Sequence, residues 1–448
     1  MSSTITLTIT QGKLSGQQYI FESRSTFIIG RNDDCNLQIA HNVDMTISRY
    51  HCLLDINPPD IRVRDLGSLN GTFVNGKKIG QRQREQPAKE AIKLNFPEYN
   101  LQDGDEIQLG DILFKITVEV KSQLNKTPES PVQEENAKPN FVTIVKKILD
   151  LAQGDNTIAQ GISGYNLIKT LGKGAFGEVF LAKHIQTKQL IALKVMLPAV
   201  SNQKQGIEMF LLETGNIKML QHPNIVQLLD YGFVENTFFL TMEYLPGGNV
   251  WDLMQKSGWR LPVDIAVNIT LQVLDGLIYA HEVEIPGTKL ATGNLTKSKG
   301  LVHRDLKPNN IFINNINDKI DVKIGDYGLS KAFDLAGLSG QTLTGTKMGT
   351  PAFMPRQQVL DFQHELPEID IWATAACLYN MLTGYFPRDF TGDPWLSVLQ
   401  HNPVPIRKRH DSIPKKLAEV IDLALREKPQ IHFQTAAEFK QALLDCMS

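Results

Sequence analysis

The chain has 448 residues, a formal net charge of −2 and four cysteines without a CxxC pair, a length that predicts two or three domains. Residues 1–120 hold 13 basic and 15 acidic side chains, so no basic excess favours a nucleic-acid partner. Apolar runs stay short of the roughly 18 to 20 residues that span a bilayer. We therefore expect a cytoplasmic protein with reduced thiols and no membrane span.

The first 120 residues alternate short β-branched or aromatic segments with turn residues. The segments include TITLTIT, FIIG, CLLDI, TFVNG and LFKITVEV, and NPPD, GSLNG and QDGD lie between them. This pattern predicts an all-β sandwich. Residues 82–99 are too long for a hairpin turn and are predicted to bulge from one end.

Three motifs stand in this part, in the order FIIGRNDD, TISRYH and DLGSLNGTFVNG. Their arginines, serine and asparagine are loop donors suited to a phosphate and a peptide backbone. Together they resemble a forkhead-associated (FHA) domain, a reader of phosphothreonine peptides, over residues 1–120. The resemblance implies that Arg31 and Ser48 hold the phosphate, that Arg49 assists and that Asn70 bonds the peptide backbone.

The same resemblance implies structural roles for other residues of these motifs. Gly30 and His51 are expected to be architectural. Leu69 replaces a threonine that often precedes the asparagine, which removes one hydroxyl contact. An all-β accessory domain with another role is the alternative.

Residues 121–160 are predicted to be a linker that contains one amphipathic helix. KSQLNKTPESPVQEENAKPN is polar and holds three prolines. The next segment, FVTIVKKILDLA, places Phe141, Ile144, Val145 and Ile148 on one helical face. Packing on the following domain is favoured over a partner-binding role for this face.

Residues 161–248 are rich in strands with one helix, and residues 249–448 are mainly helical. In LGKGAFGEV, Gly172, Gly174 and Gly177 have GxGxxG spacing, and glycine lets the backbone approach phosphate oxygens. This motif alone is weak evidence for a nucleotide site. In a dinucleotide-binding site the same spacing would be followed by a helix. The next strand, IALKVM, carries Lys194 between apolar residues, where an ammonium needs an anionic partner.

Two later segments, GLVHRDLKPNNIFI and VKIGDYGLS, gather the chemistry-bearing residues. Asp305, Lys307, Asn310 and Asp326 supply two carboxylates, an ammonium and an amide within 22 residues. Hard oxygen ligands beside a glycine-rich loop suggest magnesium and a nucleoside triphosphate. The alternative is an accidental turn with buried salt bridges.

Residues 165 to about 445 resemble a eukaryotic-like protein serine/threonine kinase, close to the bacterial members. The resemblance implies an α+β bilobal fold, ATP, and Mg²⁺ or Mn²⁺. Asp305 would orient and deprotonate the substrate hydroxyl, Lys307 would neutralise the transferring phosphoryl, and Glu213 would pair with Lys194. Asn310 and Asp326 would hold the metal. The implied nucleotide-contacting residues are Gly172, Lys173, Gly174, Gly177, Val179, Lys194, Met242 at the gatekeeper place, Glu243 and Leu245.

Residues 335–360, which resemble an activation loop, contain no Asp or Glu. A phosphate would bring about two negative charges opposite Arg304. The candidate phosphorylation sites are Thr342, Thr344 and Thr346, and ordinary loop hydroxyls are the alternative. Thr350 resembles the threonine that marks serine/threonine specificity.

The sequence departs from the kinase pattern at the end of this loop. Relatives end it with alanine, proline and glutamate, where this chain has PRQ, and His432 stands where relatives carry arginine. Because both partners of a buried ion pair are changed, we expect Gln357 to bond His432 instead. Tyr327 in DYG replaces a phenylalanine of similar size. Residues 282–299 are an insertion, expected as a surface excursion more than as a docking site.

The sequence therefore predicts a protein serine/threonine kinase that autophosphorylates on its activation loop and carries a phosphothreonine reader. Its expected partners are protein substrates, phosphothreonine peptides and the chain itself, in cis or as a transient dimer. A pseudokinase scaffold is the main alternative, and a third interpretation makes the kinase only a regulator of the reader.

Overall fold

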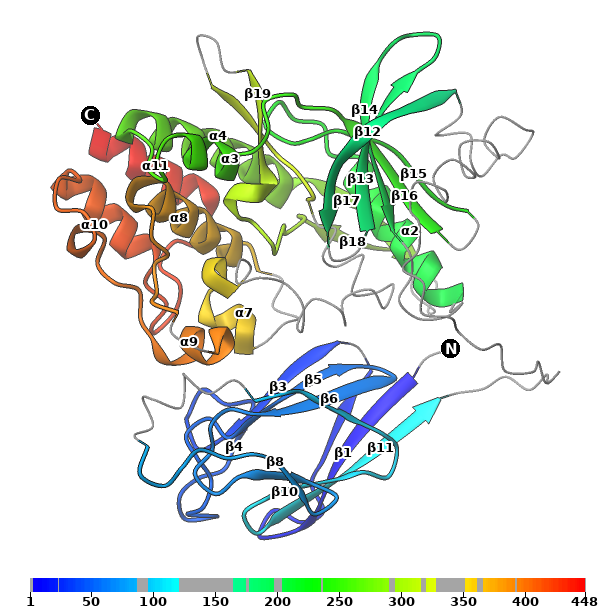
Figure 1. Ribbon diagram of the computed structural model, residues 1–448, viewed down its shortest axis with the longest axis vertical. Coiled ribbons are helices and arrows are strands. Elements are labelled where there is room, and N and C mark those ends of the chain that lie inside the picture. The colour runs from blue at the N-terminus through cyan, green and yellow to red at the C-terminus, as the bar shows by residue number, and fades with distance from the viewer. Residues whose placement is uncertain are drawn as a thin grey trace.

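The protein consists of a β-sandwich and a two-lobed part that contains most of its helices (Figure 1). The computed structural model describes residues 3–22, 24–86, 96–120, 164–174, 177–196, 204–234, 237–289, 295–315, 320–327, 351–360, 366–390 and 393–447. The predicted linker and its helix lie outside these residues, as do Thr342, Thr344, Thr346 and Thr350.

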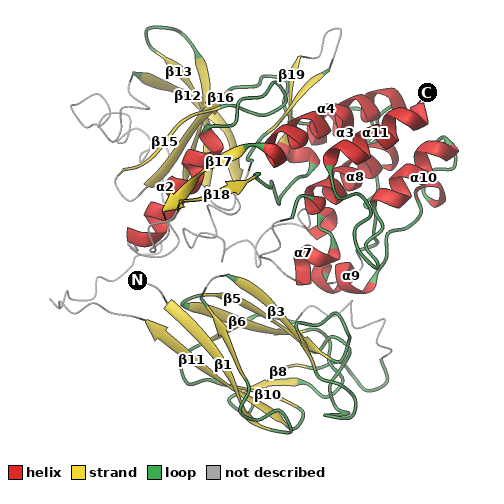
Figure 2. Cartoon of the chain, turned by 180° about the vertical axis from the view of Figure 1, so that it is seen from behind, coloured by secondary structure: helices red, strands yellow, loops and turns green. Residues whose placement is uncertain are grey.

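The β-sandwich is built from two sheets (Figure 2). The six-stranded sheet has the order β2 (Gln18–Phe21), β1 (Ser3–Gln11), β11 (Ile112–Val120), β10 (Glu106–Leu109), β7 (Thr72–Val74) and β8 (Lys77–Gly80). The five-stranded sheet has the order β4 (Leu37–Gln38), β3 (Ser25–Gly30), β5 (Cys52–Asn57), β6 (Asp60–Asp65) and β9 (Tyr99–Leu101).

The alternating sequence of β1 explains its place in the sandwich. Ile5, Leu7 and Ile9 are buried, while the threonines between them are partly or fully exposed. A strand turns successive side chains to opposite faces, so one apolar row covers the interior. The predicted all-β sandwich is confirmed.

The described part of the smaller lobe is an antiparallel sheet with one helix. The sheet has the order β12 (Tyr165–Gly174), β13 (Gly177–His184), β14 (Leu190–Met196), β16 (Thr237–Glu243) and β15 (Leu228–Val234). Helix α2 (Lys204–Lys218) packs against β15. Two apolar clusters, one on each face of the sheet, stabilise this lobe.

The larger lobe is mainly helical. Among the described residues its helices are α3 (Val250–Lys256), α4 (Val263–Glu282), α7 (Arg356–Leu360), α8 (Glu368–Thr383), α9 (Pro394–Gln400), α10 (Lys415–Ala424) and α11 (Ala436–Met447), with short 3₁₀ turns η3 (Pro308–Asn310), η5 (Pro351–Phe353) and η6 (Ile406–Lys408). Strands β19 (Ile311–Asn315) and β20 (Asp321–Ile324) form one hairpin. The predicted insertion forms a second hairpin, β17 (Glu284–Lys289) and β18 (Leu295–Lys299). The predicted α+β bilobal fold is confirmed.

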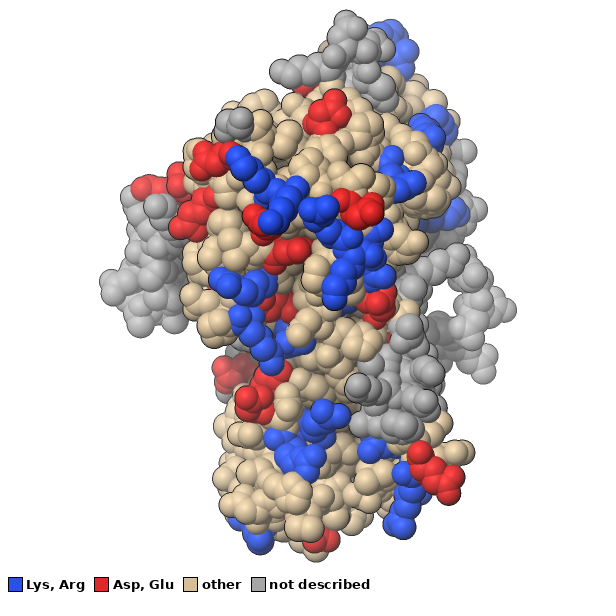
Figure 3. Space-filling model, turned by 90° about the vertical axis from the view of Figure 1, so that its left-hand side faces the viewer, with Lys and Arg blue, Asp and Glu red and all other residues tan. Residues whose placement is uncertain are grey.

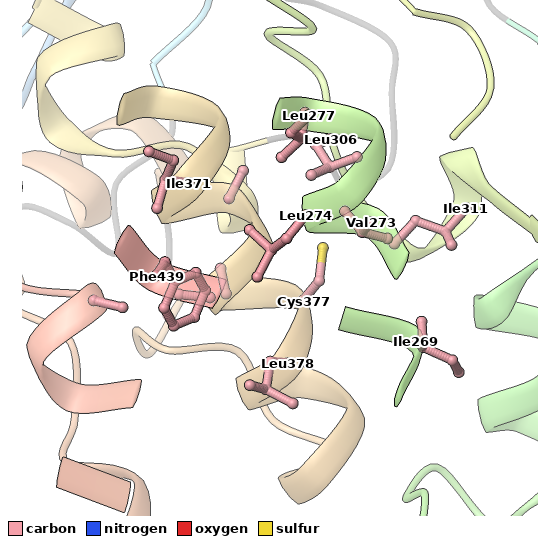
Figure 4. Close-up of a cluster of buried hydrophobic side chains, with 14 of the residues drawn as sticks. Ile269, Val273, Leu274, Leu277, Leu306, Ile311, Ile371, Cys377, Leu378 and Phe439 are labelled. Atoms are coloured by element: carbon pink, nitrogen blue, oxygen red, sulfur yellow. The ribbon is translucent and has the colours of Figure 1, made fainter. Parts of the chain in front are cut away.

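Helices α4 and α8 form the centre of the larger lobe. Figure 4 shows Val273 and Leu274 of α4 close to Cys377 of α8. Within the described ranges, α4 alone has the length and composition of a membrane-crossing helix. Its apolar side chains pack against α8, α11 and β20, which accounts for its hydropathy as that of a core helix.

Candidate functional site

The predicted catalytic residues lie together in the segment before β19. Lys307 Nζ contacts Asp305 Oδ2 at 2.7 Å. Asn310 Nδ2 donates to the main-chain oxygen of Asp305 at 2.7 Å and approaches its Oδ2 at 3.4 Å. Two donors hold one carboxylate oxygen, yet 30% of the Asp305 side chain remains exposed. The carboxylate is thus fixed in place and still accessible to a substrate.

A second acidic residue, Asp326, lies just beyond β20. Its Oδ2 accepts a hydrogen bond from Lys194 Nζ of β14 at 2.9 Å. Burial alone would raise the pKa of Asp326, but Lys194, His303 and Lys307 hold it below its ordinary value. Gly325 N donates to Asn310 O at 2.8 Å, which brings the two predicted metal ligands to one place.

Two residues of this site have a positive φ, which is uncommon for residues other than glycine. The values are 70° at Arg304 and 53° at Asp326. Each such conformation costs on the order of 1 to 3 kcal/mol and persists where the surroundings impose it. The surroundings therefore hold the backbone at Arg304, directly before Asp305, and at Asp326.

The glycine-rich segment forms the hairpin between β12 and β13. Gly172, Val179 and Lys194 are neighbours in one row across β12, β13 and β14. A Cβ at Gly177 would lie 1.9 Å from the main-chain oxygen of Val195, whereas one at Gly172 would meet nothing within 4 Å. The chain itself requires glycine at the first position, and at the second it leaves room for a ligand. Lys173 is exposed and pairs with Glu178 at 2.8 Å.

The predicted hinge follows β16. Met242 pairs with Ala192 of β14, and Leu245 is buried just beyond the strand. The Glu243 carboxylate accepts hydrogen bonds from Gln227 N at 2.8 Å and Lys323 Nζ at 2.7 Å. These contacts fix the hinge to both lobes. Glu213 lies half-buried on α2, and its pairing with Lys194 remains a prediction.

Asp370 of α8 supports the catalytic segment, and the sequence reasoning missed it. Its carboxylate accepts hydrogen bonds from the main-chain N–H of His303 at 2.7 Å and of Arg304 at 2.9 Å. His281 Nε2 lies 2.9 Å away. Burial raises the pKa of Asp370, but His281 and His303 hold it below the ordinary value. The signal in the sequence was an acid placed directly before the apolar run IWATAAC.

Tyr327 and His303 close the interior side of the segment. The Tyr327 hydroxyl donates to Leu301 O at 3.0 Å, and its ring lies 5.0 Å from that of His303. His303 Nε2 lies 2.9 Å from Gly325 O. The extra hydroxyl of Tyr327 is therefore satisfied, although it is buried.

The predicted bond between Gln357 and His432 is wrong. Gln357 Nε2 donates to the main-chain oxygen of Glu427 at 2.8 Å, and His432 Nδ1 lies 2.7 Å from Arg426 Nη2 at the surface. The buried ion pair of this region joins Glu427 to Arg388. Glu427 supplies the carboxylate of this ion pair, and α7 does not. A buried ion pair therefore still anchors this region, but its partners differ from the predicted ones. No local pattern shows this, because Arg388 and Glu427 are 39 positions apart.

The predicted phosphopeptide residues lie on neighbouring loops of the β-sandwich. Arg31 N donates to Ser48 O at 2.9 Å, and Ser48 Oγ accepts from Leu69 N at 2.9 Å, which leaves the hydroxyl proton for a ligand. Asn70 Nδ2 donates to Thr46 O at 2.6 Å. Arg31, Ser48 and Asn70 are half-buried and Arg49 is exposed.

Gly30 and His51 hold these loops together. A Cβ at Gly30 would lie 2.3 Å from Arg49 O, so no larger residue fits without a shift. His51 Nδ1 accepts from Ser48 N at 3.2 Å, and Nε2 lies 3.1 Å from Gly71 O. Both contacts agree with the architectural parts expected for these residues.

Arg82, after β8, is a further basic residue at this site, and the sequence reasoning did not include it. Its main-chain N–H donates to Ser68 O at 2.9 Å, next to the turn that Ser48 holds. Among the described residues, its buried Nε has no hydrogen-bond partner. Burial and the nearby charge of Arg49 lower the pKa of Arg82. Arg49 and Arg82 place two positive charges close together, and the Nε donor of Arg82 can bind an anion there.

The larger site suits a nucleotide with a divalent cation. Lys194 holds the pKa of Asp326 low against the effect of burial, and Asn310 turns its amide nitrogen to Asp305, so the amide oxygen of Asn310 is directed elsewhere. Carboxylate and amide oxygens are the ligands that Mg²⁺ accepts beside phosphate. The open space at Gly172 and the ammonium of Lys194 lie on the neighbouring sheet.

This arrangement is that of a phosphotransferase preceded by a β-sandwich. Residues 165–438 match the protein kinase domain model, and residues 27–110 match the FHA domain model. The chain belongs to the protein kinase family.

The chain is also similar to curated relatives and to solved structures of kinases. The chain is 29% identical over 288 residues to Serine/threonine-protein kinase PknB of Mycobacterium leprae and 28% identical over 294 residues to Tyrosine-protein kinase MasK of Myxococcus xanthus. These matches cover 62% and 64% of the chain but 42% and 43% of the relatives, so the chain spans less than half their length. The crystal structure of Rad53 1-466 in complex with AMP-PNP has a TM-score of 0.49, 21% identity and 99% coverage of both chains. The Mycobacterium tuberculosis PknI kinase domain has a TM-score of 0.47 and 22% identity, over 63% of this chain and 96% of that one.

Proposed function

We propose that the chain is a serine/threonine kinase that transfers the γ-phosphoryl of ATP to protein hydroxyls and to its own activation loop. The observation that supports this most is the joint position of Asp305, Lys307 and Asn310 beside the Lys194–Asp326 pair. Serine/threonine specificity is supported by the Thr350 motif and by the name of the PknB relative. Protein substrates, a transient dimer and a cytoplasmic location remain predictions.

Each residue of the site has a task that follows from its position. Asp305, held by Lys307 and Asn310, orients a substrate hydroxyl and accepts its proton. Lys307 and Lys194 place positive charge where phosphate oxygens carry negative charge. Asn310 and Asp326 would hold a divalent ion, Mg²⁺ or Mn²⁺, which neutralises charge on the phosphates. Asp370 keeps the backbone of His303 and Arg304 in register for this task.

The alternative of a pseudokinase scaffold is not supported. The family match covers residues 165–438, and Lys194, the partly exposed Asp305 and Asp326, whose pKa Lys194 lowers against the effect of burial, are all in place. An inactive relative would need none of these groups to be positioned together.

Phosphoryl transfer is tested with purified chain, labelled ATP, Mg²⁺ and a generic protein substrate. Asp305→Asn should lower labelling by about 1000-fold or more, because the proton acceptor and an anchor of Lys307 are lost together. Asp411→Asn, a change of the same kind at an exposed position, is the matched control. Equal labelling in wild type and Asp305→Asn contradicts the proposal.

We also propose that the FHA domain binds phosphothreonine peptides through Arg31, Ser48, Arg49 and Asn70, with Arg82 as an additional contact. Arg82 Nε, which has no hydrogen-bond partner within the described ranges, and Ser48 Oγ, which accepts from Leu69 N and can still donate its proton, support this assignment. Titration with a peptide of residues 338–348, with and without phosphate on Thr344, tests it. Arg31→Ala should remove binding of the phosphorylated peptide, and binding that survives this change argues against the assignment.

A further inference from the structure

The outer face of the five-stranded FHA sheet is buried, although such a face is usually solvated in an antiparallel sandwich. Ile28 of β3, Leu53 of β5 and Arg64 of β6 form one row across the sheet. Their exposures are 0%, 4% and 6%. Their chain neighbours, such as Phe27 and Leu54, point into the sandwich interior. Both faces of this sheet are therefore covered.

Helices α7 and α9 of the larger kinase lobe cover this face. Figures 1 and 2 show β3, β5 and β6 turned toward both helices from opposite viewing directions. Ile28, Leu53 and Tyr50 belong to one apolar cluster with residues of the kinase lobe. Those residues are Met354, Val359, Trp395, Leu396, Val398 and Leu399. Apolar side chains of this number on each side form a continuous core between the two parts.

Polar contacts give this interface a defined register. Arg64 Nη1 lies 2.8 Å from Asp393 Oδ2, and both side chains are buried. Asp393 also accepts a hydrogen bond from Leu396 N at 2.8 Å as the cap of α9. Asn36 Nδ2 donates to Leu360 O at the end of α7 at 2.7 Å. Because a buried charge is stable only when it is paired, the Arg64–Asp393 contact favours one docked position over others.

The docked domain connects to the catalytic segment through α7. Gln358 Nε2 of α7 donates to the main-chain oxygen of Arg304 at 2.7 Å, one residue before Asp305. Asp305 stays 30% exposed with the FHA domain in this position. The FHA domain thus supports the rear of the catalytic segment without covering its carboxylate.

Figure 3 shows a face on which basic and acidic side chains are interspersed over both parts. The docking face differs from this mixed surface, because it buries an apolar cluster and the Arg64–Asp393 pair.

We propose that the FHA domain is a fixed brace of the kinase lobe. The outer face of its five-stranded sheet holds α7 and α9 and, through Gln358, keeps the catalytic segment in its active arrangement. Docking uses Ile28, Leu53 and Arg64 of this face, whereas the proposed phosphopeptide contacts come from Arg31 and Ser48 on the loops beside it. The effect on activity rests on the proposed kinase function, whereas the docking itself does not.

The full chain with Ile28→Glu tests the brace, because a carboxylate in the buried row opens the interface without entering the sandwich interior. Ile20→Glu is the matched control, since Ile20 lies on β2 of the other sheet and is 62% exposed. Hydrogen exchange should rise in α7 and α9 for Ile28→Glu alone, and small-angle scattering should show a larger radius of gyration. Labelling of a generic substrate should fall about tenfold, as expected when a catalytic group loses its support.

Unchanged exchange of β1 and β11 shows that the FHA domain of the variant is still folded. Arg64→Met, which removes the ion pair without adding a buried carboxylate, should change exchange in the same direction. Higher labelling in Ile28→Glu would overturn the brace in favour of an inhibitory contact. Scattering and exchange equal to the wild type would overturn the docking. A wild-type chain without phosphoryl transfer would contradict the proposed function, while scattering and exchange would still decide the docking.

Discussion

The buried pair of Glu427 and Arg388 gives the sharpest prediction for the stability of the kinase lobe. Glu427→Gln keeps the side-chain volume but removes the charge that faces Arg388, and both side chains are almost completely buried. Removing one partner of such a pair costs about 3 to 5 kcal/mol. Arg388 keeps the carbonyl oxygens of Met354 at 3.1 Å and His401 at 3.0 Å, so we expect the lower end, about 3 kcal/mol.

Urea unfolding of the full chain, followed by the fluorescence of buried tryptophan, measures this loss. A difference of about 3 kcal/mol moves the midpoint of the kinase-lobe transition by about 1 M. Adding Arg388→Met should cost little more, because the pair is then removed as a unit. His432→Ala, at the exposed position where the sequence predicted the anchor, should stay within about 0.5 kcal/mol. A small loss for Glu427→Gln, or a similar loss for His432→Ala, would refute the assignment of the anchor.

Three further outcomes can be measured. Asp370→Asn weakens the acceptor of the main-chain N–H groups of His303 and Arg304. We expect kcat to fall about 100-fold with little change in KM for ATP. An unchanged kcat in steady-state assays would show that Asp370 does not support the catalytic segment. Burial raises the pKa of Asp326, but Lys194 holds this pKa below its value in the unfolded chain. Ionised Asp326 therefore stabilises the fold above about pH 4. This contribution is lost as the pH falls through the lower pKa of the folded state. The difference in urea midpoint between wild type and Asp326→Asn should therefore shrink from about pH 6 to about pH 3, and a constant difference would be inconsistent with the shift. Arg82→Ala should weaken phosphothreonine-peptide binding about tenfold in calorimetry, equivalent to about 1.4 kcal/mol. The control Arg84→Ala, at an exposed position two residues along, should have a much smaller effect. Equal losses of affinity would show that Arg82 makes no specific contact with the peptide.

The sequence predicted the fold class and the residues around the phosphoryl-transfer site. Spacing in the chain was sufficient there, because Asp305, Lys307 and Asn310 contact one another within six residues. The alternation in β1 similarly needed only the period of two that a half-buried strand imposes. Such patterns are local, and tertiary packing had only to preserve them.

The tertiary structure alone decided which distant residues became partners. Gln357 and His432 looked like a compensating pair, but Glu427 reached Arg388 and left His432 at the surface. Asp370 supports the catalytic segment from a helix more than 60 positions away. Residues 27–29 and 52–54 are apolar at successive positions, which indicates burial on both faces of the strands but not what covers the second face. Complementary surfaces are properties of folded shapes, so only the packed structure identified α7 and α9 as the cover of the FHA sheet.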